Sequence, residues 1–295
     1  MLISHSPRQL QIFVALATHG SMRRAAGHLH LTQPALSMAL AGLEHQLGVT
    51  LFDRERGRLH LSADGRSLLP LAREILERME AFEQRAAGTA GELRGELRLG
   101  ASNTVGNYLV HDLLGGFVAA HGEVDIRLHV ANTDAIIGDL LRHALDLGCV
   151  EGPVAHPQLE SLPWRQDALV ACAPPEHPLA RRKRLRAADF SGTHWIVRET
   201  GSATRVQTER AMAVLPSVRV VLELGQIEAI KQAVAAGLGL AFLPRVALDE
   251  ALSSGRLVAL STPFLDLDRQ LSLVIHRRRN RGPVLEAFLA RAGRA

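Results

Sequence analysis

The apolar positions of residues 21–47 follow two helical stripes separated by a short break. The first stripe consists of Met22, Ala25, Ala26 and Leu29, and the second of Leu36, Leu40, Leu43 and Leu47. Spacings of three and four residues place each set on one face of a helix. Thr32 is a favourable N-cap, and Pro34 suits the first turn of the second helix. The pattern predicts a helix-turn-helix, although any helical hairpin in an α-helical domain would show the same periodicity.

The face of the longer helix opposite its leucines is polar enough to enter a DNA major groove. Downstream, Leu51-Phe52 and Leu59 with Leu61 alternate with polar residues around Arg56-Gly57, which predicts two short strands forming a wing. Three arginines cluster there, where a wing meets DNA phosphates or the minor groove; a solvated charged loop is the alternative. The residues expected to contact DNA are Ser21, Arg23, Thr32, Gln33, Pro34, Ser37, Met38, Arg54, Arg56 and Arg58.

Two further helices flank this region. A first helix, carrying Leu10, Phe13, Val14 and Ala17, is expected to end at Gly20 and to pack beneath the helix-turn-helix. Ser62 is expected to cap a long helix over residues 63–87, kinked at Pro70. Its apolar seam consists of Leu68, Ala72, Ile75, Met79 and Phe82. The seam covers only about two heptads, so either a dimerisation helix or a core-facing helix fits it. The small residues from 87 to 95 predict a hinge.

Beyond the hinge, apolar strands alternate with helical patterns. The expected strands are residues 96–100, 125–130, 145–150, 168–172, 194–198, 219–224, 238–243 and 271–276. The first expected helix ends near residue 120. The next ones cover residues 134–143, with Thr133 as the cap, 203–213 and 227–236, and a last helix begins at Pro283. A basic segment, ARRKRLRAADF, precedes the second set as a surface helix or loop. Such βαβ units predict a parallel sheet with helices on both faces, here divided into two lobes with ligand space between them.

Two polar turns of this second half have the composition of an anion site. Ser102, Asn103 and Thr104 follow one strand, and the turn from Gly201 to Arg205, which includes Ser202 and Thr204, opens a helix. Hydroxyls and backbone N–H groups at helix N-termini favour anions, so the two turns together could clasp a small anion or carboxylate. Ordinary helix capping is the alternative for each turn alone.

Composition narrows the possible functions. The chain has 295 residues, 47% of them apolar and 22% charged, with a net charge of +4, which is typical of a globular protein of two or three domains. Two cysteines, Cys149 and Cys172, indicate a reducing compartment. Neither a secretion signal nor a membrane-length apolar run is present, so a cytoplasmic protein without membrane contact is expected. Hydrolase, metalloprotease, phosphate-loop and dinucleotide motifs are missing and the histidines are scattered, so no enzyme activity, metal or cofactor is expected.

The N-terminal residues resemble the winged helix-turn-helix of LysR-type transcriptional regulators. The resemblance is carried by Leu10-x-x-Phe13, Gly20-Ser21-Met22-x-x-Ala25-Ala26, Leu31-Thr32-Gln33-Pro34-Ala35-Leu36-Ser37, Leu43-Glu44-x-x-Leu47-Gly48, Leu51-Phe52-x-Arg54 and Leu61-Ser62-x-x-Gly65. The second half is similar to the same family. Its segments SNTVGNYL, LDLGCVEG, HWIVRETGSATR and LELGQIEAIKQAVAAGLG resemble the branch tied to sulfur assimilation and carbon fixation.

The resemblance implies a dimerising linker helix and a two-lobed effector domain like type 2 periplasmic binding proteins. It also implies four-subunit assemblies on DNA that a small effector controls. The resemblance to this branch favours an inorganic or phosphorylated anion as that effector. By the same resemblance Ser102, Thr104, Thr133, Ser202 and Thr204 line the effector cleft; Asn103 and Arg205 complete the expected set. Met38, Ala41 and Gly42 depart from the family, where many relatives carry Arg, Lys or Gln, so operator choice would depend more on the wing and on DNA shape.

The expected architecture is therefore an α+β multidomain chain. Residues 1–65 form the winged helix-turn-helix, 66–94 the linker helix and hinge, and 95–295 the α/β effector domain. Within the latter, lobe I covers about 95–165 and 271–295, and lobe II about 166–270. The expected function is a homodimeric, or homotetrameric, transcriptional regulator that binds double-stranded DNA. The alternatives are a solute-binding protein whose N-terminal helices only dimerise, and an enzyme on the same two-lobed fold.

Overall fold

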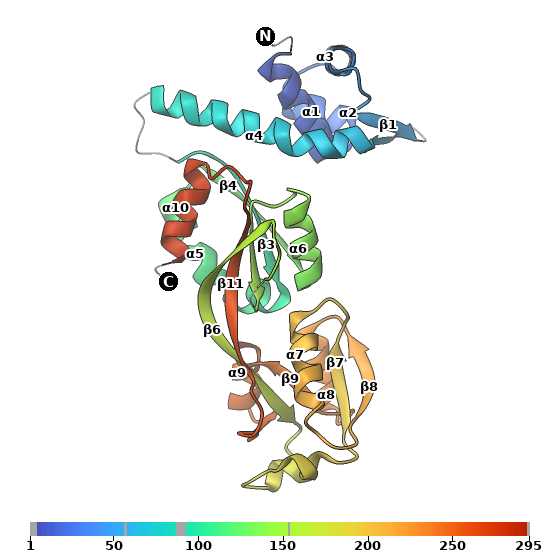
Figure 1. The fold of residues 1–295 in the computed structure, drawn as a ribbon, viewed down its shortest axis with the longest axis vertical. Helices are drawn as coiled ribbons and strands as arrows, with labels where there is room; N and C mark the ends of the chain where they lie inside the picture. The colour runs from blue at the N-terminus through green and yellow to red at the C-terminus, as the bar shows by residue number, and fades with distance from the viewer. Residues whose placement is uncertain (1–4, 56–57, 87–92, 153, 294–295) are drawn as a thin grey trace. The chain divides into compact units, whose positions relative to one another are not determined.

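The computed structural model describes residues 5–55, 58–86, 93–152 and 154–293. The chain divides into two compact units (Figure 1). Unit 1 consists of Met1–Gly95 with Asn280–Pro283, and unit 2 of Glu96–Arg279 with Val284–Ala295. No described helix is both long and apolar enough to cross a lipid bilayer.

Unit 1 begins with the predicted helices. Its elements are α1 (Pro7–His19), α2 (Met22–His28), α3 (Gln33–Leu47), β1 (Phe52–Glu55), β2 (Arg58–Leu61) and α4 (Ala63–Ala86). The Ser21 hydroxyl accepts from the Arg24 N–H at 3.2 Å and the Thr32 hydroxyl from the Ala35 N–H at 3.4 Å, so each begins its helix as a cap. Gly20 ends α1 with a φ of 64°, a left-handed conformation that glycine adopts without strain. The helix-turn-helix prediction is confirmed.

A shared apolar core joins these helices. Leu36, Leu40 and Leu43 of α3 are buried against Phe13 and Leu16 of α1. A buried leucine side chain contributes about 1.5–3 kcal/mol relative to an exposed one, so the stripe identified in the sequence fixes which face of α3 points inward. The opposite face of α3 is therefore left to solvent.

The wing is held to α3 by one carboxylate. Glu44 accepts hydrogen bonds from the backbone N–H groups of Leu51, at 2.7 Å, and Phe52, at 3.3 Å. These bonds set the direction in which the chain enters β1, which pairs with β2 in antiparallel register. The predicted wing strands are confirmed; its predicted turn, Arg56-Gly57, lies outside the described residues.

The two interpretations of the long helix apply to different parts of α4. Leu68 and Ala72 pack into the core of unit 1, whereas Ile75 is 42% and Phe82 73% exposed. The Ser62 hydroxyl accepts from the Gly65 N–H at 2.9 Å, as predicted for its cap, and the helix continues through Pro70. The first half of the seam is therefore a core face, and the second half is apolar and unpartnered among the described residues.

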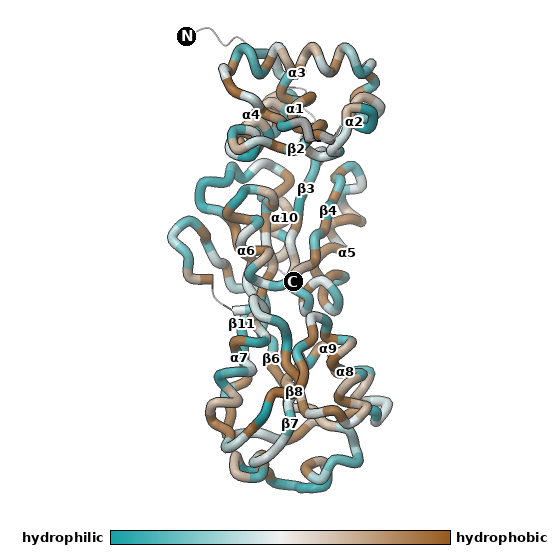
Figure 2. The backbone as a smooth tube through the Cα atoms, turned by 90° about the vertical axis from the view of Figure 1, so that its right-hand side faces the viewer, coloured by the Kyte–Doolittle hydropathy of each residue, from teal (hydrophilic) through white to brown (hydrophobic). Residues whose placement is uncertain are grey.

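Unit 2 contains a seven-stranded sheet with the order β10-β6-β11-β5-β3-β4, in which β9 also pairs with β6. The strands are β3 (Gly95–Ser102), β4 (Val124–Ala131), β5 (Leu147–Glu151), β6 (Leu159–Ala173), β9 (Ala241–Pro244), β10 (Val258–Leu260) and β11 (Asp268–His276). In lobe I, η1 (Val105–Leu109), α5 (Val110–Ala120) and α10 (Pro283–Ala292) cover one face and α6 (Thr133–Leu141) the other, as predicted. Figure 2 shows the same elements coloured by hydropathy.

Lobe II surrounds a smaller parallel pair, β7 (His194–Arg198) and β8 (Arg219–Leu224). Its helices are α7 (Ala203–Met212), α8 (Ile227–Ala235) and α9 (Arg245–Ser253), with short turns η2 (Pro178–Arg181) and η3 (Ala187–Phe190). Trp195 on β7 is buried and stacks on Phe242 of β9, with ring centroids 4.5 Å apart. This lobe therefore has its own core.

The structure corrects five details of the expected second half. The sheet is mixed, because β11 runs antiparallel to β5 and β6, whereas β3 and β5 are parallel. The expected strand 238–243 begins only at Ala241, and α9 and β10 were not predicted. Asn132, not Thr133, caps α6 through its side-chain oxygen. The long strand β6 crosses the expected lobe boundary at residue 165, since it pairs with β11 in lobe I and with β9 and β10 in lobe II.

Candidate functional sites

The predicted DNA-facing residues of α3 lie together on the surface of unit 1. Thr32, Gln33 and Pro34 are exposed at the start of α3, and Ser37 is half-buried one turn further. Met38 is 76% exposed, so an apolar side chain stands in the open on the face that the leucines leave free. This face offers Gln33 and Ser37 as its hydrogen-bonding side chains near the start of the helix.

Two of the remaining DNA candidates lie at the beginning of α2. Ser21 is its N-cap and Arg23 is exposed one residue into the helix. The backbone of Arg54 and Arg58 belongs to β1 and β2, respectively, whereas Arg56 lies outside the described residues. The wing arginines therefore remain predictions from the sequence.

Arg269 of β11 joins the two polar turns that the sequence singled out. Its guanidinium donates to the Thr104 hydroxyl at 3.3 Å and to the Thr204 hydroxyl at 3.0 Å. It also forms an ion pair with Asp167, at 2.6 Å. A guanidinium carries five donors in a fixed fork, so one side chain can hold both turns at once. The turns do meet, but a protein cation lies between Thr104 and Thr204 where an anion was expected.

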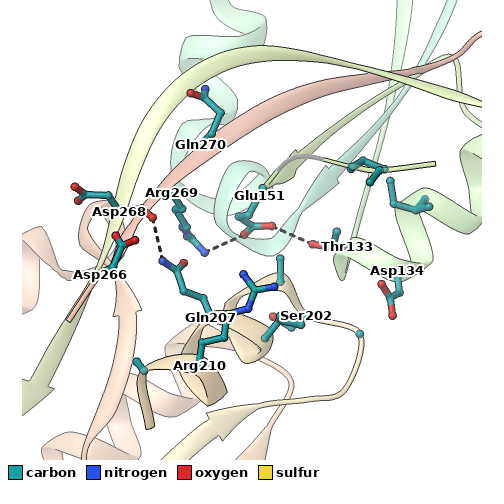
Figure 3. A pocket seen from close by; sticks show the side chains of 18 of the residues that line it. Thr133, Asp134, Glu151, Ser202, Gln207, Arg210, Asp266, Asp268, Arg269 and Gln270 are labelled. Atoms are coloured by element: carbon teal, nitrogen blue, oxygen red, sulfur yellow. Dashed lines mark hydrogen bonds and ion pairs between the residues drawn. The ribbon is translucent and has the colours of Figure 1, made fainter. Parts of the chain in front are cut away.

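Glu151, at the end of β5, completes this cluster. It accepts from the Thr133 hydroxyl at 3.1 Å and lies 3.9 Å from Arg269 (Figure 3). Burial raises the pKa of the Glu151 carboxyl, but the Arg269 guanidinium and hydrogen bonds from Thr104 and Ser102 outweigh burial and hold the pKa below its usual value. Glu151 is therefore a carboxylate at neutral pH, and it belongs to the wall of a cavity.

That cavity has a volume of about 1080 Å³ and opens between the lobes. Lobe I contributes Thr133, Asp134 and Glu151, and lobe II contributes Ser202 and the inner face of α7. The two walls touch at the rim, where the Asp134 N–H donates to the Gly201 carbonyl at 3.0 Å. Gly201 has a φ of 88°, which lets this turn present its carbonyl to the other lobe.

The cavity carries charges of both signs. Four acids line it, the buried Glu151 and the exposed Asp134, Asp266 and Asp268. Arg210 of α7 is an exposed cation with no ion pair among the described residues. Ser202, the N-cap of α7, is buried and makes no side-chain cap hydrogen bond. A free hydroxyl and a free guanidinium on one helix are suited to an anionic group.

The remaining predicted effector residues differ in position. Ser102, Asn103 and Thr104 are buried at the end of β3, behind the cavity wall. Arg205 faces away: its guanidinium is held by Glu209 and Glu223 at 2.5 and 2.9 Å. Sequence reasoning missed Arg269, Asp167, Glu151 and Arg210. Glu151 directly follows a predicted strand and could have been found there, whereas Arg269 gains its role only through tertiary contacts.

A second contact between the lobes involves the only tyrosine of the chain. The hydroxyl of Tyr108, on η1, donates to Glu228 of α8 at 2.5 Å, and Lys231 binds the same carboxylate oxygen at 2.8 Å. Burial raises the pKa of Tyr108, and the hydrogen bond to Glu228 adds to the rise. The phenol is therefore a neutral donor that ties lobe I to lobe II.

Neither a metal-ligating group nor a reactive thiol is found in the part of the chain that the structure describes. No three His, Cys, Asp or Glu side chains of these residues come together in a way that could hold a metal. Cys149 and Cys172 are both buried, and burial raises the pKa of each thiol, to about 12 for Cys172. Both are core residues.

Comparison with known proteins gives matches over both units. Residues 7–66 match the model of the bacterial regulatory helix-turn-helix protein, lysR family, and residues 90–295 match the LysR substrate binding domain. The uncharacterised HTH-type transcriptional regulator YeiE of Escherichia coli K12 is 36% identical over 96% of this chain and 95% of its own. The RuBisCO operon transcriptional regulator of Allochromatium vinosum is 34% identical over 96% and 94%, respectively.

One solved structure resembles unit 2 in sequence as well as in fold. The regulatory domain of CcmR from Synechocystis PCC6803, in complex with 2-PG, is 28% identical and superposes with a TM-score of 0.64. The match covers 68% of this chain and 97% of that one.

Proposed function

Because the chain belongs to the LysR family of DNA-binding transcriptional regulators, in the branch that includes RuBisCO operon regulators, we propose that α3 and the wing contact DNA and that a small anionic ligand controls this binding. The start of α3 enters the major groove, and the wing arginines contact the phosphates or the minor groove. A small anionic effector binds between the lobes of unit 2. The family is one of regulators and not of enzymes.

The proposed DNA contacts rest on one observation. The leucine stripe of α3 is buried, so Gln33 and Ser37 are the hydrogen-bonding side chains on the open face near the start of the helix. Glutamine pairs with adenine and serine with several base edges, while Met38 can contact a thymine methyl group. With so few donors, DNA shape and the wing contribute much of the choice of operator.

A gel-shift series tests this assignment on the DNA upstream of the chain's own gene. The double variant Gln33→Ala with Arg54→Ala should lower affinity by at least tenfold, because a base contact and a phosphate contact are lost together. Gln46→Ala, at the far end of α3, is the matched control and should bind as the wild type does. Unchanged retardation of the double variant would remove the proposed mechanism.

The effector proposal rests on the free polar groups of α7. Ser202 and Arg210 line the cavity without partners among the described residues, and the helix N-terminus beside Ser202 adds a partial positive charge. The complex of CcmR with 2-PG is in keeping with a small ligand for this domain type. Effector binding would act by favouring one arrangement of lobes or subunits over another.

Calorimetry with sulfate, sulfite and 2-PG tests the anion site. The variant Ser202→Ala with Arg210→Gln should weaken binding of the active probe at least tenfold, since a charge-assisted contact is removed. Arg205→Gln on the same helix removes the same charge outside the cavity and should leave binding unchanged. Equal affinity of all three proteins would contradict the site, and heat from none of the probes would contradict the anion.

The proposed assembly is a homodimer, or a tetramer of two dimers, formed through α4. One face of α4 exposes Leu71 in its first half and Ile75, Met79 and Phe82 in its second half, an apolar stripe that is unfavourable in water. The proposed location is the cytoplasm, because a regulator must reach chromosomal DNA.

A further inference from the structure

The basic segment at the end of lobe II is not explained by the winged helix or by the cavity. Five cations occur within six residues, from the last residue of η2 to the residue before η3: Arg181, Arg182, Lys183, Arg184 and Arg186. All five side chains are exposed. This basic loop, residues 181–186, forms the tip of lobe II that lies away from lobe I, at the lower end of Figure 1, and it is strongly hydrophilic in Figure 2.

The loop is held in place by side chains that point inward. Leu179, Leu185 and Phe190 are buried in the core of lobe II on both sides of the charges. Asp189 accepts from the Arg186 N–H at 2.8 Å and forms an ion pair with Arg182. The backbone is therefore ordered before any partner arrives, which lowers the entropic cost of binding.

Four of the five cations lack an acidic partner. Arg182 is neutralised by Asp189, but Arg181, Lys183, Arg184 and Arg186 make no ion pair or side-chain hydrogen bond among the described residues. The other acid close by in sequence is Glu176. Like charges this close repel one another, and a bound polyanion would relieve the repulsion.

We propose that the basic loop is a second, sequence-independent DNA contact, which binds the phosphate backbone of duplex DNA beside the operator. Phosphate contacts need only well-placed cations, and arginine suits phosphate geometry best. A protein partner would be expected to find apolar anchors in the patch, but its only large apolar residue, Leu185, is buried. Because the winged helix already binds the chain to DNA, phosphates are present at a high local concentration. Weak contacts by the loop are therefore enough to add to the affinity.

The salt dependence of DNA binding by the full-length protein tests this proposal. The variant Arg181→Gln, Lys183→Gln, Arg184→Gln keeps the Arg182–Asp189 pair and the turn after it. Each phosphate contact contributes about −0.9 to the slope of log K against log salt, so the slope should become shallower by about one to three. Hydroxyl-radical protection of the DNA flanking the operator should also shrink.

The matched control removes three other exposed arginines of unit 2, as Arg219→Gln, Arg277→Gln, Arg278→Gln. It has the same net charge as the loop variant and should keep the wild-type slope and footprint. Equal slopes for all three proteins would overturn the proposal. If the loop variant bound DNA like the wild type but no longer supported transcription, the proposal would also be overturned, and the loop would instead be a binding site for an acidic protein. Thermal melting checks that each variant is folded.

Discussion

Single residues in this chain have consequences that depend on one close neighbour. His276 is buried at the end of β11, and its Nδ1 accepts from the Arg278 N–H at 3.2 Å. Its ring lies 4.1 Å, centroid to centroid, from that of His143. Burial, with further contributions from His143, Arg278 and His156, lowers the pKa of His276. The ring is therefore neutral in the folded protein at neutral pH.

Acidification should destabilise the protein through this residue. The unfolded chain takes up a proton at the ordinary histidine pKa of about 6.5, whereas the folded chain does so only at lower pH. The stabilising contribution is thus complete above about pH 6.5 and is lost as the pH falls towards the folded pKa. Melting temperatures between pH 5 and 8 should fall less steeply on acidification for His276→Gln than for the wild type. An identical pH profile would contradict this, and His45→Gln, at an exposed site, serves as control.

Gly65 gives a second prediction for a single position. A Cβ there would lie 2.1 Å from the Leu51 carbonyl oxygen, so the backbone between the wing and α4 would have to move. Gly65→Ala should therefore lower the free energy of unfolding by about 1–3 kcal/mol in chemical denaturation. Gly27→Ala, in α2 with no neighbour within 4 Å, should be neutral or slightly stabilising. A destabilisation that is the same at both positions would point to general helix effects instead.

At the scale of one element, α4 combines two functions that its heptad pattern could not separate. Leu68 and Ala72 of its first half belong to the unit 1 core, so the exposed apolar residues, most of them in the second half, are the part available to the proposed partner subunit. Met79→Glu with Phe82→Glu should therefore dissociate the proposed oligomer and leave the melting of unit 1 nearly unchanged, because charged side chains are costly in an apolar interface. Light scattering after size exclusion measures the mass. The control, Arg78→Ala, removes an exposed side chain whose ion pair among the described residues is with Glu74, and it should not alter the mass.

At the level of unit 2 as a whole, side-chain hydrogen bonds join the two lobes. Arg269 donates to both Thr104 and Thr204, and Tyr108 donates to Glu228. A hydrogen bond to a charged group contributes about 1.5–3 kcal/mol, so each contact can shift the balance between closed and open arrangements.

Tyr108→Phe should loosen this closure without unfolding either lobe. Amide hydrogen exchange is expected to accelerate in η1 and α8, which the hydroxyl joins, and to remain unchanged in α6. Faster exchange throughout unit 2 would instead show that the tyrosine supports a lobe's core. Wild-type protection at both elements would contradict a role in closure.

Features that depend on local periodicity and capping could be predicted from the sequence alone. The leucines of α3, the caps Thr32 and Ser62, and strands β7 and β8 were all predictable, because helix and strand patterns are set by neighbouring residues. The residue types of both polar turns were visible for the same reason. Which side chain these turns contact, in contrast, depends on the tertiary structure. Arg269 lies 65 residues from Thr204 and 165 from Thr104, so no local pattern could bring its guanidinium between them. The fold alone brings residues so far apart in the sequence into contact with this buried charge.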